Sequence, residues 1–113
     1  MDFSVHQRRY GDRTIVAAAG DIDVDSSPRL REFLVGLVDD GARHLVIDLG
    51  GVTFLDSTGL GVMVGVFRRL GTANGSLVFA GGTAAVRGVF HMTQLTRVFA
   101  LHDTLDQALR PAH

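Results

Sequence analysis

The stretch FLDSTGLGV, residues 54–62, combines the side chains of this chain that are best suited to chemistry. A hydrophobic run stops at one carboxylate and two hydroxyls, and two glycines then open a second hydrophobic run. A serine beside an activating group can act as a nucleophile, glycine-rich turns bind phosphate, and Asp or Ser caps helices. The stretch could therefore be a catalytic turn, a phosphate-binding loop, a plain helix start, or a serine that another enzyme modifies.

The catalytic and nucleotide-binding uses each lack a residue that their chemistry requires. A nucleophile elbow has the pattern Gly-x-Ser-x-Gly, and Leu55 stands where its first glycine belongs. The glycines that follow Ser57 miss the dinucleotide pattern Gly-x-Gly-x-x-Gly by one residue. No acid lies between Asp56 and Asp103, so the carboxylate that would bind a ribose is absent as well. We therefore expect no catalytic residue and no bound cofactor.

The composition excludes further kinds of chemistry. The chain has 113 residues and a net charge of −1, and it contains neither Cys nor Lys. Thiolate nucleophiles, disulfides, Cys-bound zinc, a Walker-type phosphate lysine and Schiff bases are therefore excluded. The five histidines are scattered without a His-x-x-x-His pair, so we expect no metal site. The balanced charge argues against direct binding of nucleic acid.

The start of the chain and its hydropathy indicate where the protein works. Residues 1–3 include an acid and give no sign of a signal peptide. No apolar run reaches the roughly 18 residues of a membrane span. We therefore expect a cytoplasmic protein.

Hydrophobic patterning predicts an α/β domain with elements in the order ββαβαβαβα. Short apolar runs predict strands at residues 3–5, 14–19, 44–49, 76–80 and 97–99. Apolar residues spaced three and four apart predict helices at residues 28–38, 60–70, 86–90 and 101–109. This alternation is typical of a mixed, largely parallel sheet, here of four or five strands packed with about four helices. Right-handed crossovers place consecutive helices on one face if the strand order runs in one direction.

Two local signals set the expected boundaries in the first half of the chain. Residues 20–23, Gly-Asp-Ile-Asp, are expected to end the second strand because glycine and aspartate break strands. Ser27 precedes Pro28, and a serine before a first-turn proline is typical of a helix N-cap.

The second helix is expected to have more polar groups at its start, and more apolar surface, than its packing needs. Capping requires one side chain, which contributes about 1 kcal/mol, yet three polar residues occur together at 56–58. The residues expected to face the core are Leu60, Met63, Val64, Phe67 and Leu70. Val62 and Val66 are expected to lie to the side. This extra surface either packs on a neighbouring helix or receives a partner beside Ser57.

The sequence resembles the STAS-domain anti-sigma-factor antagonists over essentially its whole length. The resemblance rests on Asp56-Ser57-Thr58-Gly59-Leu60-Gly61, preceded by Leu49, Val52 and Phe54, and on the element Gly20-Asp21-Ile22-Asp23. It implies a single STAS domain over residues 1–113. It also implies a protein that binds an anti-sigma factor in the unphosphorylated state, releases a sigma factor and is switched off by serine phosphorylation. The alternative is a non-phosphorylated STAS scaffold or a subunit of a stress-signalling or lipid-transport complex.

The resemblance also assigns roles to residues. Ser57 matches the family's phosphoacceptor, and Thr58 is the second choice. The partner-binding residues that it implies are Asp23, Asp56, Ser57, Thr58, Gly59, Leu60 and Val62. A turn-capping role is the equally weighted alternative for Asp23. The implied partners are an anti-sigma factor that is also a serine kinase and binds the ATP, and a phosphoserine phosphatase.

One loop departs from the family pattern. Residues 93–95 read Thr-Gln-Leu, whereas the family often has Ser/Thr-Gly-Leu. Gln94 therefore replaces a glycine, the residue that adopts a positive φ most easily. The conformation of this loop cannot be transferred from the family.

Overall fold

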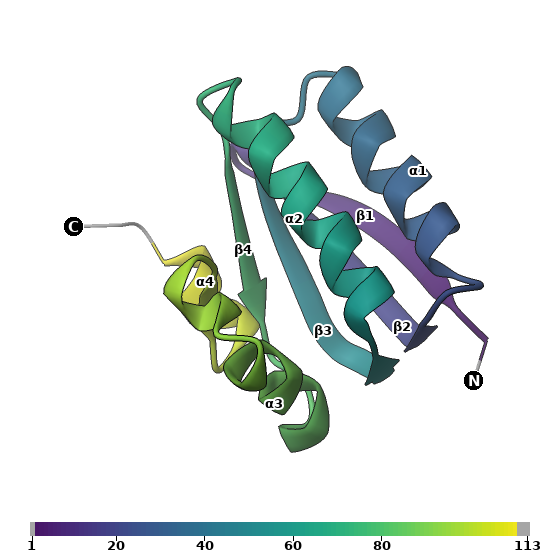
Figure 1. The fold of residues 1–113 in the computed structure, drawn as a ribbon. Helices are drawn as coiled ribbons and strands as arrows, with labels where there is room; N and C mark the ends of the chain where they lie inside the picture. The colour runs from purple at the N-terminus through teal and green to yellow at the C-terminus, as the bar shows by residue number, and fades with distance from the viewer. Residues whose placement is uncertain (1, 111–113) are drawn as a thin grey trace.

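The computed structural model describes residues 2–110 and is built around one five-stranded sheet (Figure 1). The strands, in spatial as well as chain order, are β1 (Ser4–Tyr10), β2 (Arg13–Ile22), β3 (His44–Leu55), β4 (Ser76–Ala80) and β5 (Ala100–His102). β1 is antiparallel to β2, and the other neighbouring strands are parallel. The predicted mixed, largely parallel sheet is confirmed. Residue 1 and residues 111–113 of the predicted domain lie outside the described residues.

Within the described residues, three helices lie in the connections between the parallel strands, and a fourth follows the last strand. They are α1 (Ser27–Asp39), α2 (Ser57–Gly71), α3 (Ala84–Met92) and α4 (Leu105–Leu109), with a 3-10 turn at Leu95–Arg97. From β2 to β5 each crossover moves one strand along in the same direction, so right-handed connections place α1, α2 and α3 on one face. α4 packs on the opposite face, where Ala108 meets Val46 and Ala80. The predicted order ββαβαβαβα is confirmed.

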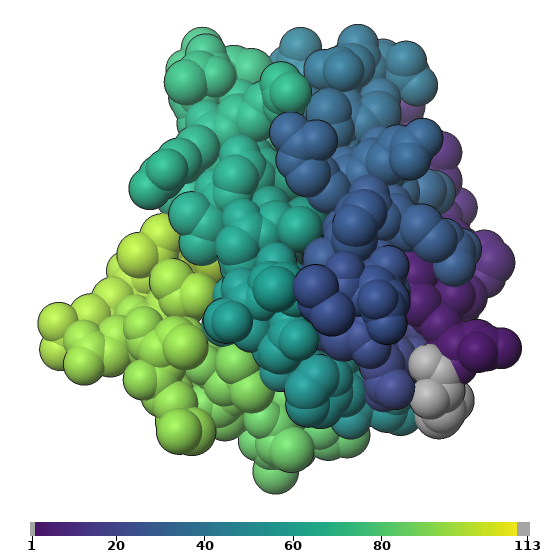
Figure 2. Space-filling model, turned by 45° about the vertical axis from the view of Figure 1, so that its right-hand side comes forward, coloured from purple at the N-terminus to yellow at the C-terminus, as the bar shows by residue number. Residues whose placement is uncertain are grey.

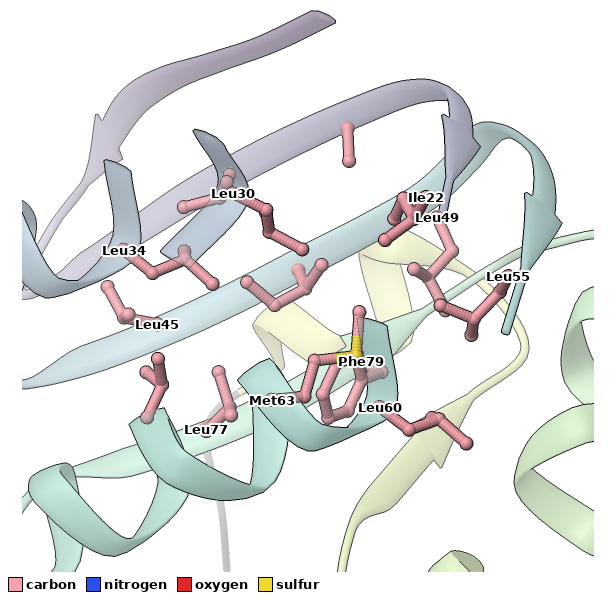
Figure 3. Close-up of a cluster of buried hydrophobic side chains, with 14 of the residues drawn as sticks. Ile22, Leu30, Leu34, Leu45, Leu49, Leu55, Leu60, Met63, Leu77 and Phe79 are labelled. Atoms are coloured by element: carbon pink, nitrogen blue, oxygen red, sulfur yellow. The ribbon is translucent and has the colours of Figure 1, made fainter. Parts of the chain in front are cut away.

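The main core lies between the sheet and the layer formed by α1, α2 and α3. Alternate residues of β3 and β4 point into it, because successive side chains of a strand face opposite sides. Figure 3 shows Leu34 of α1 and Met63 of α2 pointing into the core between the helices and the sheet. Val66 belongs to the same core at 1% exposure, so the expectation that it lies to the side is wrong. It stands three residues after Met63 and four before Leu70, which puts all three on one face.

β2 and β3 both run further than their sequence patterns predict. The expected break at residues 20–23 is wrong, because β2 continues to Ile22 beside β3, which continues to Leu55. Register shifts in the β2–β3 pairing absorb the irregular backbone around Gly20, which has a φ of +84°. A Cβ at Gly20 would collide with the carbonyl oxygen of Asp2, so only glycine fits there. The extension brings both strand ends to the start of α2.

The last strand lies later than predicted. Residues 97–99 have an apolar pattern, but Arg97 ends the 3-10 turn and Phe99 precedes β5. Phe99 is buried against the rings of Phe67, Phe79 and Phe90, at centroid distances of 5.2, 5.0 and 6.4 Å. Its apolar character therefore reflects an aromatic cluster in the core rather than strand pairing.

Candidate functional site

Residues 54–62 lie where two parallel strands end together. β3 ends at Leu55, Asp56 follows, and α2 begins at Ser57. The N–H of Asp56 donates to the carbonyl oxygen of Ile22 at 3.2 Å, which ties this turn to the end of β2. The carboxyl ends of parallel strands are the usual place for binding sites in α/β folds. The start of α2 is therefore our candidate functional site.

Asp56 is the cap of α2. Its Oδ1 accepts hydrogen bonds from the N–H of Thr58 at 2.9 Å and of Gly59 at 3.3 Å, and from the Thr58 hydroxyl. The hydroxyl bond, helped by the two N–H groups, lowers the pKa of Asp56 below its ordinary value. The capping role considered for residues 56–58 therefore belongs to Asp56, which stays ionised at neutral pH.

The two hydroxyls beside Asp56 differ in their bonding. Thr58 donates to Asp56, and its Oγ1 also lies 3.2 Å from the Oγ of Ser27, which must then be the donor because a hydroxyl has one proton. The Ser57 side chain is exposed, and within residues 2–110 its hydroxyl makes no hydrogen bond. Of these two hydroxyls, a second molecule can therefore reach that of Ser57 without breaking an internal hydrogen bond.

Ser27 and its neighbour Ser26 tie α1 to this site. The N-cap of α1 is Ser26, so the prediction that Ser27 caps the helix is wrong. The Ser26 hydroxyl donates to the carbonyl oxygen of Asp21 at 2.7 Å and makes no capping bond to the helix. Ser27 is buried in the first turn of α1 and faces Thr58. The sequence pattern placed the cap one residue late. The helix starts after Ser26, whose hydroxyl bonds to the turn before the helix and so gives no capping signal.

Asp23 holds the turn between β2 and α1. Its Oδ1 accepts from the N–H groups of Asp25 and Ser26, both at 3.0 Å. This is the turn-capping geometry expected of an Asx residue. The side chain is half-buried, so a partner contact by Asp23 would use a carboxylate whose position the turn already fixes.

The remaining residues of the predicted partner surface lie at different depths. Gly59 is buried, and a Cβ on it would lie 2.6 Å from Ile22 Cγ2 and 2.7 Å from Leu55 Cδ1. Leu60 is only 4% exposed and belongs to the core, whereas Val62 is half-buried beside α1. Gly59 and Leu60 thus support the surface from below, and Asp56, Ser57 and Thr58 form it.

Two exposed apolar side chains near this edge did not enter the predicted site. Val24 is 66% exposed in the turn after β2, and Phe54 is 49% exposed near the end of β3. The exposure of Val24 could have been predicted from the sequence, because it stands between two acids, Asp23 and Asp25, in a turn. Phe54 gave no such signal, because the sequence pattern did not show that β3 continues past Gly51 with Phe54 turned to solvent.

Within residues 2–110, no group of three or more His, Cys, Asp or Glu side chains is arranged to hold a metal ion. The same residues contain no helix that is long and apolar enough to cross a membrane.

The chain has sequence relatives among known proteins. The family model described as "STAS domain" matches residues 5–108. The anti-sigma-B factor antagonist of Bacillus subtilis (strain 168) is 40% identical over 95 residues, covering 84% of this chain and 86% of the relative. The anti-sigma-B factor antagonist of Staphylococcus aureus (strain NCTC 8325 / PS 47) is 34% identical over 80 residues, covering 71% of this chain and 74% of the relative.

Solved structures give the same result for the fold. An anti-sigma factor antagonist from Mycobacterium paratuberculosis has a TM-score of 0.89 at 30% identity, covering 96% of this chain and 92% of that one. The anti-sigma factor antagonist SpoIIAA in its unphosphorylated form has a TM-score of 0.80 at 20% identity, covering 96% and 93%, a likeness of fold alone. The chain therefore belongs to the STAS domain family of anti-sigma factor antagonists.

Proposed function

We propose that this protein binds an anti-sigma factor while Ser57 is unphosphorylated, so that a sigma factor is released, and that phosphorylation of Ser57 by that partner ends the binding. The observation that supports the proposal best is the exposed Ser57 hydroxyl, which has no internal hydrogen bond within residues 2–110. Relatives named as anti-sigma-B factor antagonists supply the class of partner. The protein then acts as a regulatory ligand with no catalytic residue of its own.

The chemistry of the switch belongs to the partner. ATP bound by the anti-sigma kinase would transfer its γ-phosphoryl group to Ser57 Oγ, a base of the kinase would take the hydroxyl proton, and ADP would leave. A phosphatase would restore the hydroxyl with water and release inorganic phosphate. Thr58 is the poorer acceptor, because its hydroxyl would have to leave both Asp56 and Ser27.

Phosphate on Ser57 would stand beside a negative charge that already exists. It adds about −1.5 to −2 charge next to Asp56, whose carboxylate already accepts the N–H groups of Thr58 and Gly59. Repulsion between the two is the local effect. The helix keeps its cap, so we expect no rearrangement of α2.

The larger effect would fall on the partner. Docking over exposed apolar side chains such as Val24 and Phe54 requires that the surface around them lose its water. A doubly charged group in that surface resists desolvation. A cost of about 3–4 kcal/mol would weaken binding several hundredfold, which is enough for a switch without backbone motion.

The test uses the full chain with a candidate anti-sigma kinase from the same genome and ATP. Mass spectrometry should place the phosphate on Ser57, and Ser57→Ala should abolish phosphorylation while keeping the binding measured by calorimetry. Ser57→Asp should bind several hundredfold more weakly. Thr58→Ser is the matched control and should still be phosphorylated at Ser57.

Two results would count against the proposal. Unchanged affinity of Ser57→Asp would remove the switch. Binding to a STAS-containing assembly with no phosphorylation by any cognate kinase would instead support the scaffold alternative.

A further inference from the structure

A groove of about 550 Å³ lies between α1 and α2, on the side of these helices that faces away from the sheet. Figure 2 shows the side chains of α1, in blue, and α2, in teal, next to each other on one face of the molecule. Val35 of α1 and Gly61 and Gly65 of α2 contribute to its apolar part. The groove is open to solvent, and Ser57 is not among the residues that line it, although Val62 of the predicted partner surface is.

Gly61 and Gly65 are not explained by packing inside the chain. Both are exposed in the interior of α2, where glycine weakens a helix relative to alanine. A Cβ on either residue would meet nothing within 4 Å. Gly59, two residues earlier, is a contrast, because its Cβ would clash with Ile22 and Leu55. Glycines four residues apart lie on one side of a helix and allow another backbone to come close.

Three arginines line the same groove, namely Arg31 of α1 and Arg68 and Arg69 of α2. All three are exposed, and within residues 2–110 none of their guanidinium groups forms an ion pair or a hydrogen bond. No acid stands three or four residues from any of them along its helix, and no acid lines the groove. The groove therefore combines an apolar floor with three guanidinium groups that pair with no described residue.

We propose that this groove binds an acidic amphipathic helix of a partner protein. Small apolar side chains of that helix would lie over Gly61 and Gly65, and its carboxylates would meet Arg31, Arg68 and Arg69. Arginine suits this role, because its planar guanidinium pairs with a carboxylate through two parallel hydrogen bonds.

Other occupants fit the groove less well. A second copy of this chain in a symmetric contact would set the arginines of one groove against those of the other. A nucleic acid would meet an apolar floor on a chain with a net charge of −1, whereas nucleic-acid sites depend on broad positive surfaces. Charge complementarity with an apolar stripe is the chemistry of an acidic helix.

The arginines of the groove lie far from the proposed switch, although Gly61 and Val62, which also line the groove, follow Ser57 by only four and five residues. Arg68 and Arg69 follow Ser57 by 11 and 12 residues in one helix, which is roughly 16–18 Å along its axis at 1.5 Å per residue. That separation exceeds the Debye length of about 8 Å at physiological ionic strength. A protein phosphorylated at Ser57 should therefore still bind the helix.

The test is a selection of peptides from a displayed library of helical 18-mers, using the full-length protein as bait. The selected peptides should be rich in Asp and Glu, and fluorescence anisotropy should give their affinity. The double variant Arg68→Glu/Arg69→Glu and the groove-filling variant Gly65→Leu should each weaken binding at least tenfold. Arg97→Glu, which reverses an exposed charge outside the groove, and Ser57→Asp should leave binding within twofold. Circular dichroism should show that every variant is folded.

Several outcomes would overturn the proposal. The first is a selection that yields no acidic peptides, and the second is peptide binding that survives both groove variants. The third is peptide binding that only Ser57→Asp removes, because the peptides would then bind the switch surface instead. A 12-nucleotide single-stranded DNA that bound the groove more tightly than the peptides would also overturn it, since the site would then be a polyanion site. Loss of switching at Ser57 with intact groove binding would contradict the proposed function alone.

Discussion

The hydroxyl oxygens of Ser27 and Thr58 lie 3.2 Å apart and join the first turn of α1 to the first turn of α2. Asp56 completes the arrangement by accepting the Thr58 proton. The two helix starts on either side of β3 are thus connected by side chains as well as through the sheet. Of the two hydroxyls that follow Asp56, the Ser57 hydroxyl is therefore the one that makes no hydrogen bond within residues 2–110.

We expect the Ser27–Thr58 pair to behave as a unit in stability measurements. Thr58→Val should lower the free energy of unfolding by about 1–3 kcal/mol, because it removes a bond to Asp56 and leaves the buried Ser27 hydroxyl without its partner. The double variant Ser27→Ala/Thr58→Val should cost less than the sum of the single variants. Urea unfolding of all three proteins measures this coupling, and strict additivity would contradict it.

The cap at Asp56 should make stability depend on pH. Its pKa is lower in the folded chain than the ordinary value of 3.8, so its contribution is present above that value and is lost as the pH falls through the folded pKa. Asp56→Ala should be about 1 kcal/mol less stable than the parent at pH 7. The difference in stability should narrow below about pH 4, where the Asp56 carboxylate of the unfolded parent begins to be protonated.

Glu32→Ala is the matched control for this experiment, since its exposed carboxylate makes no hydrogen bond or ion pair within residues 2–110. Its free energy of unfolding at pH 7 should lie within about 0.5 kcal/mol of that of the parent. If the difference between Asp56→Ala and the parent did not change with pH, the cap would not act through its charge.

Two glycines of α2 should respond in opposite ways to the same substitution. Gly59→Ala should destabilise the protein by about 1–3 kcal/mol, because the new methyl group would overlap Ile22 and Leu55. Gly61→Ala should be neutral or stabilising by up to about 1 kcal/mol, because its methyl group meets open space and alanine favours a helix. Thermal or denaturant unfolding of the two variants, compared side by side, gives the answer, and equal effects would contradict the packing described for Gly59.

Gln94 adopts a left-handed conformation that glycine would tolerate better. Its φ is +60°, so the loop keeps the positive φ that the family's glycine would adopt easily. A residue with a side chain is strained in this conformation, and here that residue is Gln94. We expect Gln94→Gly to stabilise the protein by roughly 0.5 kcal/mol. Glycine relieves the backbone strain of the folded state, but it also gives the unfolded chain more conformational freedom, which offsets part of the gain.

Asn74→Gly is the comparison for this loop. Asn74 also has a positive φ, of 58°, but asparagine tolerates this region, so the gain there should be smaller. Chemical denaturation resolves such differences, and a larger gain at Asn74 than at Gln94 would contradict the reasoning.

The sequence was informative wherever hydrophobic period and turn chemistry agreed. The order of elements, the parallel sheet and the position of α2 follow from apolar runs separated by glycine and polar turns. The length of β2 was missed because Gly20 and Asp21 normally end strands, whereas here register shifts and the close approach of Asp2 keep the pairing intact. Phe99 was read as a strand residue because burial in an aromatic cluster and burial in a sheet leave the same apolar signature.

Within the candidate site, the sequence indicated the right segment but did not divide the work among its residues. Asp56, Ser57 and Thr58 looked equivalent as polar residues at a helix start. Their separate roles depend on which hydroxyl faces Ser27, a residue 31 positions away in the chain. The burial of Leu60 and the exposure of Phe54 likewise depend on the tertiary fold.

The strand order in the sheet is the same as the order in the chain, and this has a consequence for how the molecule forms. Each strand emerging from the ribosome finds its neighbour already made, so no strand has to be inserted between two others and loop closures stay short. β1, β2 and β3 can pair, and α1 can cover them, before β4 and β5 are synthesised. The turn at Asp56 depends on β2 and β3 for its backbone support, so its shape can be set early in biosynthesis.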